Sequence, residues 1–338
     1  MRCGEYRVKL RRSSRSEPRS PETATADIYY ASDVHGSDVC WRKFLGAARF
    51  YGARHLIMGG DLTGKAIVPI EIAGDGRFTT TFLGETRSGT TADQLTELVD
   101  AVRFNGMYPW ATSREDIQRH RDDDAARDQL FERVMLDELR RWIALADERL
   151  DDIDAELFII AGNDDPWSVD DVLRSSDRVV FCDDQVVRVA GHEMVSLSYA
   201  NPTPWRSPRE LDEPELYTRL RALADQLEEP QTAIFNLHVP PHDSELDRAL
   251  EISPDLTRVY RGGQPVEIPV GSHAVRQIIE EVQPLLALHG HIHESRGSAR
   301  IGRTLAINSG SEYGTGRLHG VSVRLAEDSV VSHQFLVG

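Results

Sequence analysis

The sequence predicts a layered α/β domain, because a short apolar strand, a helix and a second apolar strand follow one another near its start. The first strand is expected at 27–32 and the second at 55–58. Between them, over 38–52, apolar side chains recur at helical spacing. Strand, helix and strand in this order are typical of a right-handed βαβ unit with parallel strands.

The α/β pattern is interrupted at about 65–150, where we expect an inserted subdomain. Its predicted elements are a hairpin around the turn Gly74-Asp75-Gly76 and two charged helices, at 67–72 with 78–83, 92–104 and 125–150. A connection of this length usually has secondary structure of its own. The insert is therefore expected to be folded.

After the insert, apolar runs predict further strands and a C-terminal region rich in β-structure. They lie at 156–161, 186–189, 194–199, 233–237, 285–288, 304–308, 321–325 and 330–336. The main domain is thus expected to span 27–338. Residues 1–26 are rich in Arg, Ser, Pro and Thr and lack the apolar core of a signal peptide. We predict a disordered leader there, with a mitochondrial-type presequence as the alternative.

Composition narrows the classes of function. The 338 residues are 40% hydrophobic and contain no apolar run of the roughly 18 residues that a membrane helix needs. The three cysteines form no CxxC pair, which favours a reducing cytoplasm. The net charge of −16 argues against loose binding to long nucleic acids or anionic membranes. A small phosphate ester is still compatible, since bound cations would reverse the local field. Homo-oligomerisation stays open.

Five polar clusters each stand just past the end of an apolar run. They are Asp33-Val34-His35-Gly36, Gly59-Gly60-Asp61, Gly162-Asn163-Asp164, Asn236-Leu237-His238 and His289-Gly290-His291-Ile292-His293. Because ligands bind at the carboxyl ends of strands in open α/β sheets, we expect these segments to converge. Carboxylate, imidazole and amide donors suit divalent Mn, Fe, Co, Ni or Zn. Taken alone, each of the first two clusters is more often a turn than a metal site.

In this order the clusters resemble the motifs of the calcineurin-like metallophosphoesterases, over residues 33–293. The resemblance implies two packed β-sheets flanked by helices, a four-layer αββα sandwich. It also implies two divalent cations, with manganese the one expected to work in vitro. One would be held by Asp33, His35, Asp61 and His293. Asp61 would bridge to the second, which Asn163, His238 and His291 complete. His289 is not expected to be a ligand.

The third motif departs from many relatives, in which a histidine that protonates the leaving group follows the asparagine. Here Asp164 and Asp165 follow Asn163. Either aspartate could donate a proton if burial raised its pKa. Alternatively, one of them caps a helix that Pro166 begins. The replacement favours phosphodiesters or activated esters, which need less protonation of the leaving group.

Three further features could contribute to substrate binding. His242 follows His238 through Val239-Pro240-Pro241, and Arg296 follows the last cluster. Each could reach a substrate phosphate or could be an ordinary surface residue. In the insert, Tyr108-Pro109-Trp110 could offer aromatic surface to a nucleobase or a partner, or could simply pack. Asn308-Ser309-Gly310-Ser311 is interpreted as structural.

One sequence pattern suggests a different class of protein, an ATPase. Gly59 to Lys65 fits the core of a phosphate-binding loop, G-x-x-x-x-G-K. The next residue is Ala66, so the hydroxyl that would hold magnesium is missing. A hairpin rather than a helix is expected to follow, which removes the helix N-terminus such a loop uses. We therefore set an ATPase aside.

The function predicted from the sequence is hydrolysis of a phosphate ester, a phosphodiester above all, by a hydroxide that bridges two metals. Asp61, Asn163, Asp164 and His242 are the residues expected to take part in catalysis. The alternative is a non-catalytic scaffold that binds partners through the same metal-bearing face. A nuclease of the same fold is a third hypothesis, which the net charge disfavours.

Overall fold

Two six-stranded sheets pack face to face and form the centre of the molecule. The structure, a computed structural model, describes residues 25–253 and 255–338. The first sheet has the order β20-β19-β1-β2-β7-β8. Its strands are β1 (Ala26–Ala31), β2 (His55–Met58), β7 (Glu156–Ile159), β8 (Val179–Phe181), β19 (His319–Ala326) and β20 (Ser329–Val337). Most of the predicted leader lies outside the described residues, and its last residue belongs to β1.

The second sheet has the order β17-β18-β16-β11-β10-β9. Its strands are β9 (Gln185–Val189), β10 (His192–Leu197), β11 (Ile234–Leu237), β16 (Leu286–His289), β17 (Gly297–Ile301) and β18 (Thr304–Asn308). Between the sheets lies a continuous apolar core that includes Ile57, Phe158, Leu286 and Ile307, each at most 1% exposed. Removing this surface from water favours the packed arrangement.

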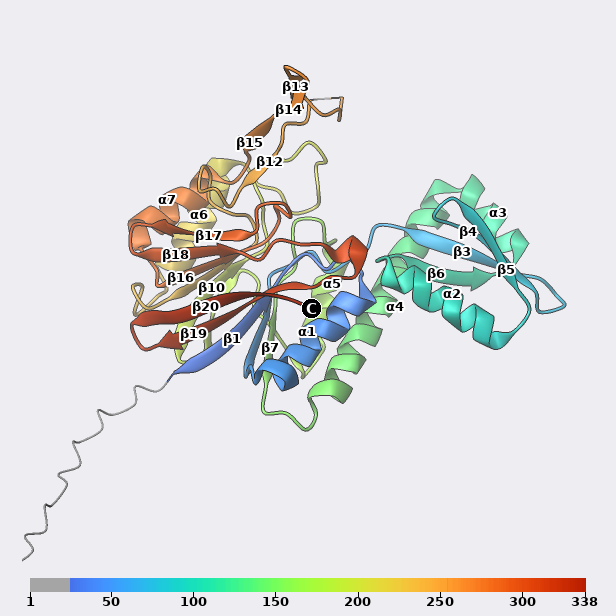
Figure 1. Cartoon of the computed structure of the whole chain (residues 1–338), viewed down its shortest axis with the longest axis horizontal. Helices are drawn as coiled ribbons and strands as arrows, with labels where there is room; N and C mark the ends of the chain where they lie inside the picture. The colour runs from blue at the N-terminus through green and yellow to red at the C-terminus, as the bar shows by residue number, and fades with distance from the viewer. Residues whose placement is uncertain (1–24, 254) are drawn as a thin grey trace, which may run out of the picture.

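Helices cover the outer face of each sheet (Figure 1). On the first sheet these are α1 (Asp38–Tyr51), the second half of α4 (Asp124–Leu150) and α5 (Ser168–Arg174), which share one apolar cluster with it. On the second they are α6 (Glu213–Ala224) and α7 (His273–Val282). The four-layer αββα architecture predicted from the resemblance is therefore confirmed. Helices α6 and α7 were not predicted from the sequence, although each has a buried apolar face.

The strand directions bring the carboxyl ends of the central strands to one edge. In the first sheet β1, β2, β7 and β8 are parallel neighbours. In the second, β10, β11, β16 and β18 are also parallel neighbours. Loops that leave these ends can meet across the two sheets, as the sequence analysis expected.

Residues between β2 and α4 form a unit with a sheet of its own, in the order β5-β4-β3-β6. Its elements are β3 (Ile67–Ile72), β4 (Phe78–Phe82), β5 (Glu85–Gly89), α2 (Ala92–Phe104), β6 (Tyr108–Thr112) and α3 (Arg114–Asp122). A small core centred on Ile70, Phe78 and Val102 holds it together. Figure 1 shows this unit standing out from the sandwich, at the right of the view.

Helix α4 joins that unit to the sandwich. Its Trp142 ring stacks on Trp41 of α1, with the ring centroids 5.1 Å apart. The Trp41 indole N–H donates to the Trp142 carbonyl oxygen at 3.0 Å, and the Trp142 indole N–H donates to Asp38 at 3.1 Å. Buried aromatic pairs with satisfied N–H groups fix relative orientation well. The insert is thus tied to the layer that covers the first sheet.

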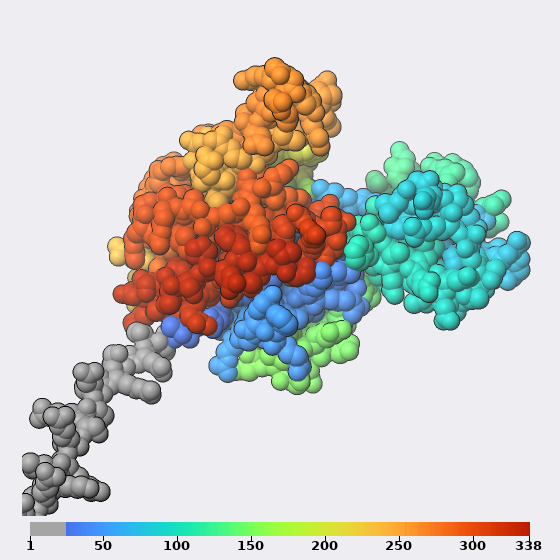
Figure 2. Space-filling view, in the orientation of Figure 1, coloured from blue at the N-terminus to red at the C-terminus, as the bar shows by residue number. Residues whose placement is uncertain are grey.

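A second projection contains β12 (Arg248–Leu250), β13 (Tyr260–Arg261), β14 (Gln264–Pro265) and β15 (Glu267–Pro269). Figure 2 shows an open recess between this projection, in orange, and the insert, in cyan. No helix in the described part of the chain combines the length and the apolarity that crossing a bilayer requires.

Candidate metal centre

Each residue of the proposed metal set follows the end of a parallel strand. Asp33 and His35 come after β1, Asp61 after β2, Asn163 after β7, His238 after β11, and His291 and His293 after β16. The loop after β1 is bonded to the loop after β2: the amide of Asp33 donates to Gly60 O and that of His35 to Asp61 O, both at 2.9 Å. Two segments of the first sheet are thereby held in register at the site.

The seven side chains lie together as two adjacent groups. In the first, Asp33 Oδ1 lies 3.4 Å from His293 Nε2, and His35 Nε2 lies 3.2 Å from the same nitrogen. The second combines Asp61, His238 and His291. Asp61 Oδ2 lies 3.5 Å from His238 Nε2 and also 3.5 Å from His35 Nε2. One carboxylate oxygen therefore stands between the two groups.

Asn163 presents its amide oxygen to the second group. Its Oδ1 lies 3.0 Å from His238 Nε2. On its other side the Nδ2 group donates to Ser207 Oγ at 2.6 Å, and that hydroxyl donates to Glu210 Oε1 at 2.6 Å. An amide that donates outward must turn its oxygen inward. Ser207 and Glu210 therefore orient Asn163, a role that no sequence pattern indicated.

Backbone geometry at the site is unusual. Asp33, His35, Asp61 and His291 all have positive φ, of 58°, 39°, 51° and 65°. This left-handed region is uncommon for residues other than glycine, and such strain concentrates at functional sites. Here it turns each loop sharply after its strand and points the side chain into the cluster.

The carboxylates control the charge of the cluster. Burial favours a higher pKa for Asp33, but His293 and His238 outweigh it and hold that pKa below its usual value. Burial also acts to raise the pKa of Asp61, and His238 and His35 lower it strongly. For His238, burial is outweighed by Asp61 and Asp33, which raise its pKa to about 10. Burial lowers the pKa of His291 to about 4.

These donors could hold divalent metal. Imidazole nitrogens and carboxylate oxygens converge within 4.8 Å in each group. Imidazole and carboxylate together are a typical ligand set for Mn, Fe or Zn. His238 Nδ1 donates to Gly59 O at 2.8 Å, which fixes the ring and turns Nε2 to the cluster.

Metal binding at His238 is expected to release a proton. The metal-free ring is protonated at pH 7 because its pKa lies near 10, and a ligand imidazole must be neutral. Affinity for Mn²⁺ should therefore rise with pH between 7 and 10, by about tenfold per unit for one displaced proton. Calorimetric titration with Mn²⁺ in buffers of different ionisation enthalpy measures this. A heat of binding that is independent of the buffer would contradict the expectation.

The two aspartates after Asn163 have different environments. Asp165 is fully buried and accepts from the amides of Leu62 at 3.0 Å, Thr63 at 2.9 Å and Gly162 at 2.9 Å. Asp164 forms an ion pair with Lys65. The proposed helix cap is wrong for both, since α5 begins at Ser168, after Trp167, with no side-chain cap. Asp165 instead anchors the loop that carries Asp61.

His242 and His289 each contact residues other than the proposed metal ligands. The His242 ring packs on His273, with centroids 3.8 Å apart, and its Nδ1 lies 3.9 Å from Asp247. None of the described contacts of His242 involves any of the seven proposed metal ligands. His289 Nδ1 donates to the carbonyl of Leu237 at 2.9 Å. This ring nitrogen is therefore engaged by the backbone.

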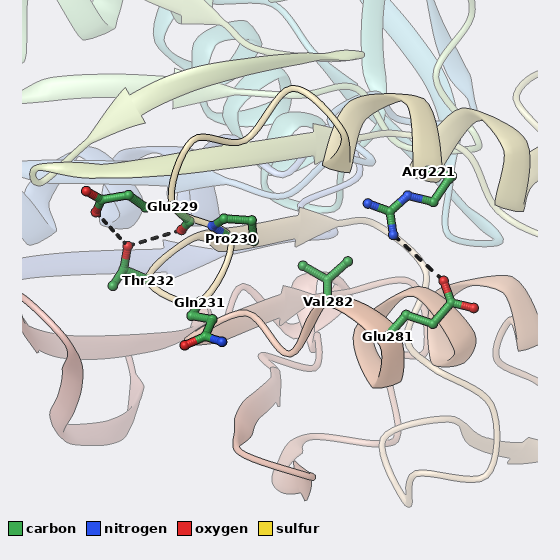
Figure 3. A pocket seen from close by; sticks show the side chains of 7 residues that line it. All are labelled: Arg221, Glu229, Pro230, Gln231, Thr232, Glu281 and Val282. Atoms are coloured by element: carbon green, nitrogen blue, oxygen red, sulfur yellow. Dashed lines mark hydrogen bonds and ion pairs between the residues drawn. The ribbon is translucent and has the colours of Figure 1, made fainter.

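Arg296 borders a cavity of about 660 Å³ that adjoins the cluster through His293. The other residues that line it are Glu294, Ser311, Glu312, Arg317, His319 and Val337. The Arg296 guanidinium lies over the Phe335 ring and donates to Leu336 O at 3.1 Å. Another cavity, of about 540 Å³, is lined by Arg221, Glu281 and the loop before β11 (Figure 3). It lies at the amino ends of β11 and β16, the edge opposite the cluster.

A buried charge network lies beneath the site, and no sequence pattern indicated it. Arg209 is fully buried and pairs with Asp170 at 2.6 Å and Asp183 at 3.3 Å. Its guanidinium also donates to the carbonyl oxygen of Asp165 at 2.9 Å, and its amide to that of Asn163 at 3.2 Å. A paired, hydrogen-bonded buried charge can fix one loop conformation. Arg209 thus holds the Asn163 loop in place.

Of the two alternatives for Tyr108-Pro109-Trp110, packing describes Tyr108. Tyr108 is buried, and its hydroxyl oxygen accepts from the amide of Gly64 at 2.6 Å. Trp110 is partly exposed and meets His120 edge-on at 5.0 Å. Tyr108 therefore links the insert to the segment that follows Asp61.

No protein-family model matches the sequence. The uncharacterized protein MJ1162 of Methanocaldococcus jannaschii is 31% identical over 155 residues, which are 45% of this chain and 63% of that protein. The match thus spans less than two thirds of that relative's length.

Among solved structures, one crystal structure is 13% identical and covers 93% of this chain and 99% of its own, with a TM-score of 0.50. An archaeal phosphodiesterase is 11% identical over 92% of this chain and 99% of its own, with a TM-score of 0.31. The first of these matches extends over nearly the whole chain at low identity. It shows that the sandwich and its connections are a shared fold.

Proposed function

We propose that the chain is a metal-dependent phosphoesterase of the calcineurin-like metallophosphoesterase type and that it hydrolyses a phosphodiester. The observation that carries the proposal is the position of Asp61 Oδ2, 3.5 Å from a histidine of each ligand group. An oxygen so placed could serve both groups at once, as a bridging ligand does. The order of the sequence motifs supports the same interpretation.

Asp33, His35, Asp61 and His293 would hold one cation, and Asp61, Asn163, His238 and His291 the other. When bound, two divalent cations lower the pKa of coordinated water and neutralise charge on the phosphoryl oxygens. Asp33 and Asp61 contribute −2 against +4 from the cations, and the amide and the neutral imidazoles add nothing. The loaded site would be positive and would attract an anionic ester despite the negative charge of the whole protein.

The two aspartates after Asn163 are poorly suited to protonate a leaving group. The Asp164 carboxylate is already engaged in the ion pair with Lys65. Burial raises the pKa of Asp165, but hydrogen bonds from the amides of Leu62 and Thr63 occupy both of its carboxylate oxygens. This arrangement favours diesters and activated esters, whose leaving groups need little protonation. His242 stays a candidate for a contact with the rest of the substrate.

Removal and return of metal tests the proposal. Purified protein supplied with Mn²⁺ should hydrolyse bis(p-nitrophenyl) phosphate, and dialysis against EDTA should reduce turnover to background. Added Mn²⁺ should restore it. The same series with p-nitrophenyl phosphate compares diester with monoester.

Two experimental outcomes would contradict the proposal and support another function. Protein that binds two equivalents of Mn²⁺ yet turns over neither ester would be the metal-bearing scaffold. Retention on DNA cellulose at moderate salt, with cleavage of long DNA, would instead indicate a nuclease.

A further inference from the structure

Lys65 stands at the accessible side of the metal cluster. Asp33, Asp61 and His238 are at most 2% exposed, so a substrate cannot approach through them. More exposed side chains at the cluster include those of Lys65 at 63%, His293 at 32% and Asp164 at 23%, and His291 is also partly exposed. An ester could therefore approach the cluster beside these side chains.

The Lys65 ammonium is held in place from two sides. Its Nζ contacts Asp164 Oδ2, and a carboxylate oxygen of Asp164 lies within 4.8 Å of ligand atoms of His35 and Asp61. The amide of Asp164 donates to Asp61 Oδ1 at 3.0 Å. On the other side, Gly64 is fixed by Tyr108 of the insert. The cation is thus anchored next to the cluster by the loops after β2 and β7.

This position has hydrogen-bonding capacity to spare. An ammonium carries three donors, and the contact with Asp164 uses one. Asp164 is the only partner found for this ammonium in the described part of the chain, so two donors remain for a phosphate that would otherwise meet the carboxylates of Asp61 and Asp164. Lysine is also rare here: the chain has only Lys9, Lys43 and Lys65 among its 39 basic residues. A compact point charge suits a phosphoryl oxygen.

We propose that Lys65 binds a phosphoryl oxygen of the substrate beside the metal centre and that Asp164 is the residue that positions its ammonium. The inference deepens the proposed function and rests on it. It gives the insert a part in substrate binding, because Tyr108 fixes the backbone from which Lys65 extends. It also gives Asp164 a role other than proton donor.

Lys65→Met, Asp164→Asn and the double variant form the test, with Lys65→Arg as the conservative variant. Each is loaded with Mn²⁺, its metal content is measured, and inorganic phosphate is titrated into it by calorimetry. Kinetics with bis(p-nitrophenyl) phosphate follow. Arg77→Met, which removes an exposed ion pair with Asp75 on the insert, is the control.

We expect Lys65→Met to keep its metal while phosphate affinity and kcat/KM both fall by about 10- to 100-fold, the effect of one charge-assisted hydrogen bond. Lys65→Arg should recover part of the loss. Asp164→Asn should weaken phosphate binding in the wild-type background and have little further effect in Lys65→Met, since it acts through the lysine.

Two results would overturn the inference. Phosphate affinity of Lys65→Met within twofold of wild type would exclude the contact. Loss of Mn²⁺ from Asp164→Asn, with an equal effect in both backgrounds, would make Asp164 a metal ligand instead. A wild-type protein that binds no Mn²⁺ or has no turnover would count against the proposed function itself, and is thus distinguishable.

Discussion

Asp61→Ala is expected to abolish both metal retention and hydrolysis of bis(p-nitrophenyl) phosphate. Asp61 Oδ2 lies 3.5 Å from His35 and from His238, so this one carboxylate serves both ligand groups. Its removal also takes away the negative charge that favours a cation in a buried site. Losing several kcal/mol of transition-state stabilisation corresponds to a fall in kcat/KM of about 10³-fold or more.

Metal content after desalting and turnover at saturating Mn²⁺ are the measurements. Asp75→Ala, which deletes an exposed carboxylate on the β3–β4 turn, is the matched control and should behave as wild type. Circular dichroism should establish that the Asp61 variant is folded. Near wild-type turnover by a folded Asp61→Ala protein would falsify the metal assignment.

The sequence could predict where the site residues lie because each follows an apolar strand. The strands at 55–58 and 304–308 have the predicted bounds. Position at a carboxyl end then brings Asp33, Asn163 and His291 together across two sheets. The strand before Asn163 ends at Ile159 rather than at the predicted residue 161. Ile160 and Ala161 are buried like strand residues, and hydrophobicity alone cannot distinguish a buried loop from a strand.

Sequence patterns could not predict interactions between residues that are far apart in the chain. Arg209 stands in a polar segment and would ordinarily be a surface residue. It is buried because Asp170 and Asp183, 39 and 26 residues away, supply compensating charge. The left-handed backbone at Asp33, His35 and Asp61 is similarly unpredictable, since such residues seldom adopt it. Tertiary contacts, rather than local preference, impose it.

Lys65 belongs to a sequence pattern whose usual meaning does not apply to this chain. The G-x-x-x-x-G-K match suggests a phosphate-binding loop, and the lack of a following hydroxyl and helix excludes one. The structure instead has β3 after this segment and an ion pair between Lys65 and Asp164. Lys65 does supply a cation near the cluster. Its partner, Asp164, could be found only from the fold.

Gly162→Ala is expected to disable the site through the backbone, without removing any ligand. A Cβ atom at this position would lie 2.1 Å from Asp61 Oδ1 and 2.3 Å from the Asp61 amide nitrogen. The second contact is with backbone, which already has a φ of 51° and whose carbonyl oxygen accepts from the His35 amide. Asp61 must therefore move, and overpacking of this kind costs about 1–3 kcal/mol of stability.

Gly46→Ala provides the matched comparison, because the same methyl group is added where nothing lies within 4 Å. Gly46 is within helix α1, where alanine should raise stability by up to about 1 kcal/mol. Thermal unfolding and Mn²⁺ titration of both variants separate the effects. We expect Gly46→Ala to be more stable with unchanged affinity, and Gly162→Ala to be less stable with Mn²⁺ affinity reduced by at least about tenfold, the loss expected when the support of a metal ligand is disturbed. Wild-type affinity in Gly162→Ala would mean that the close approach of the two loops does not set the position of Asp61.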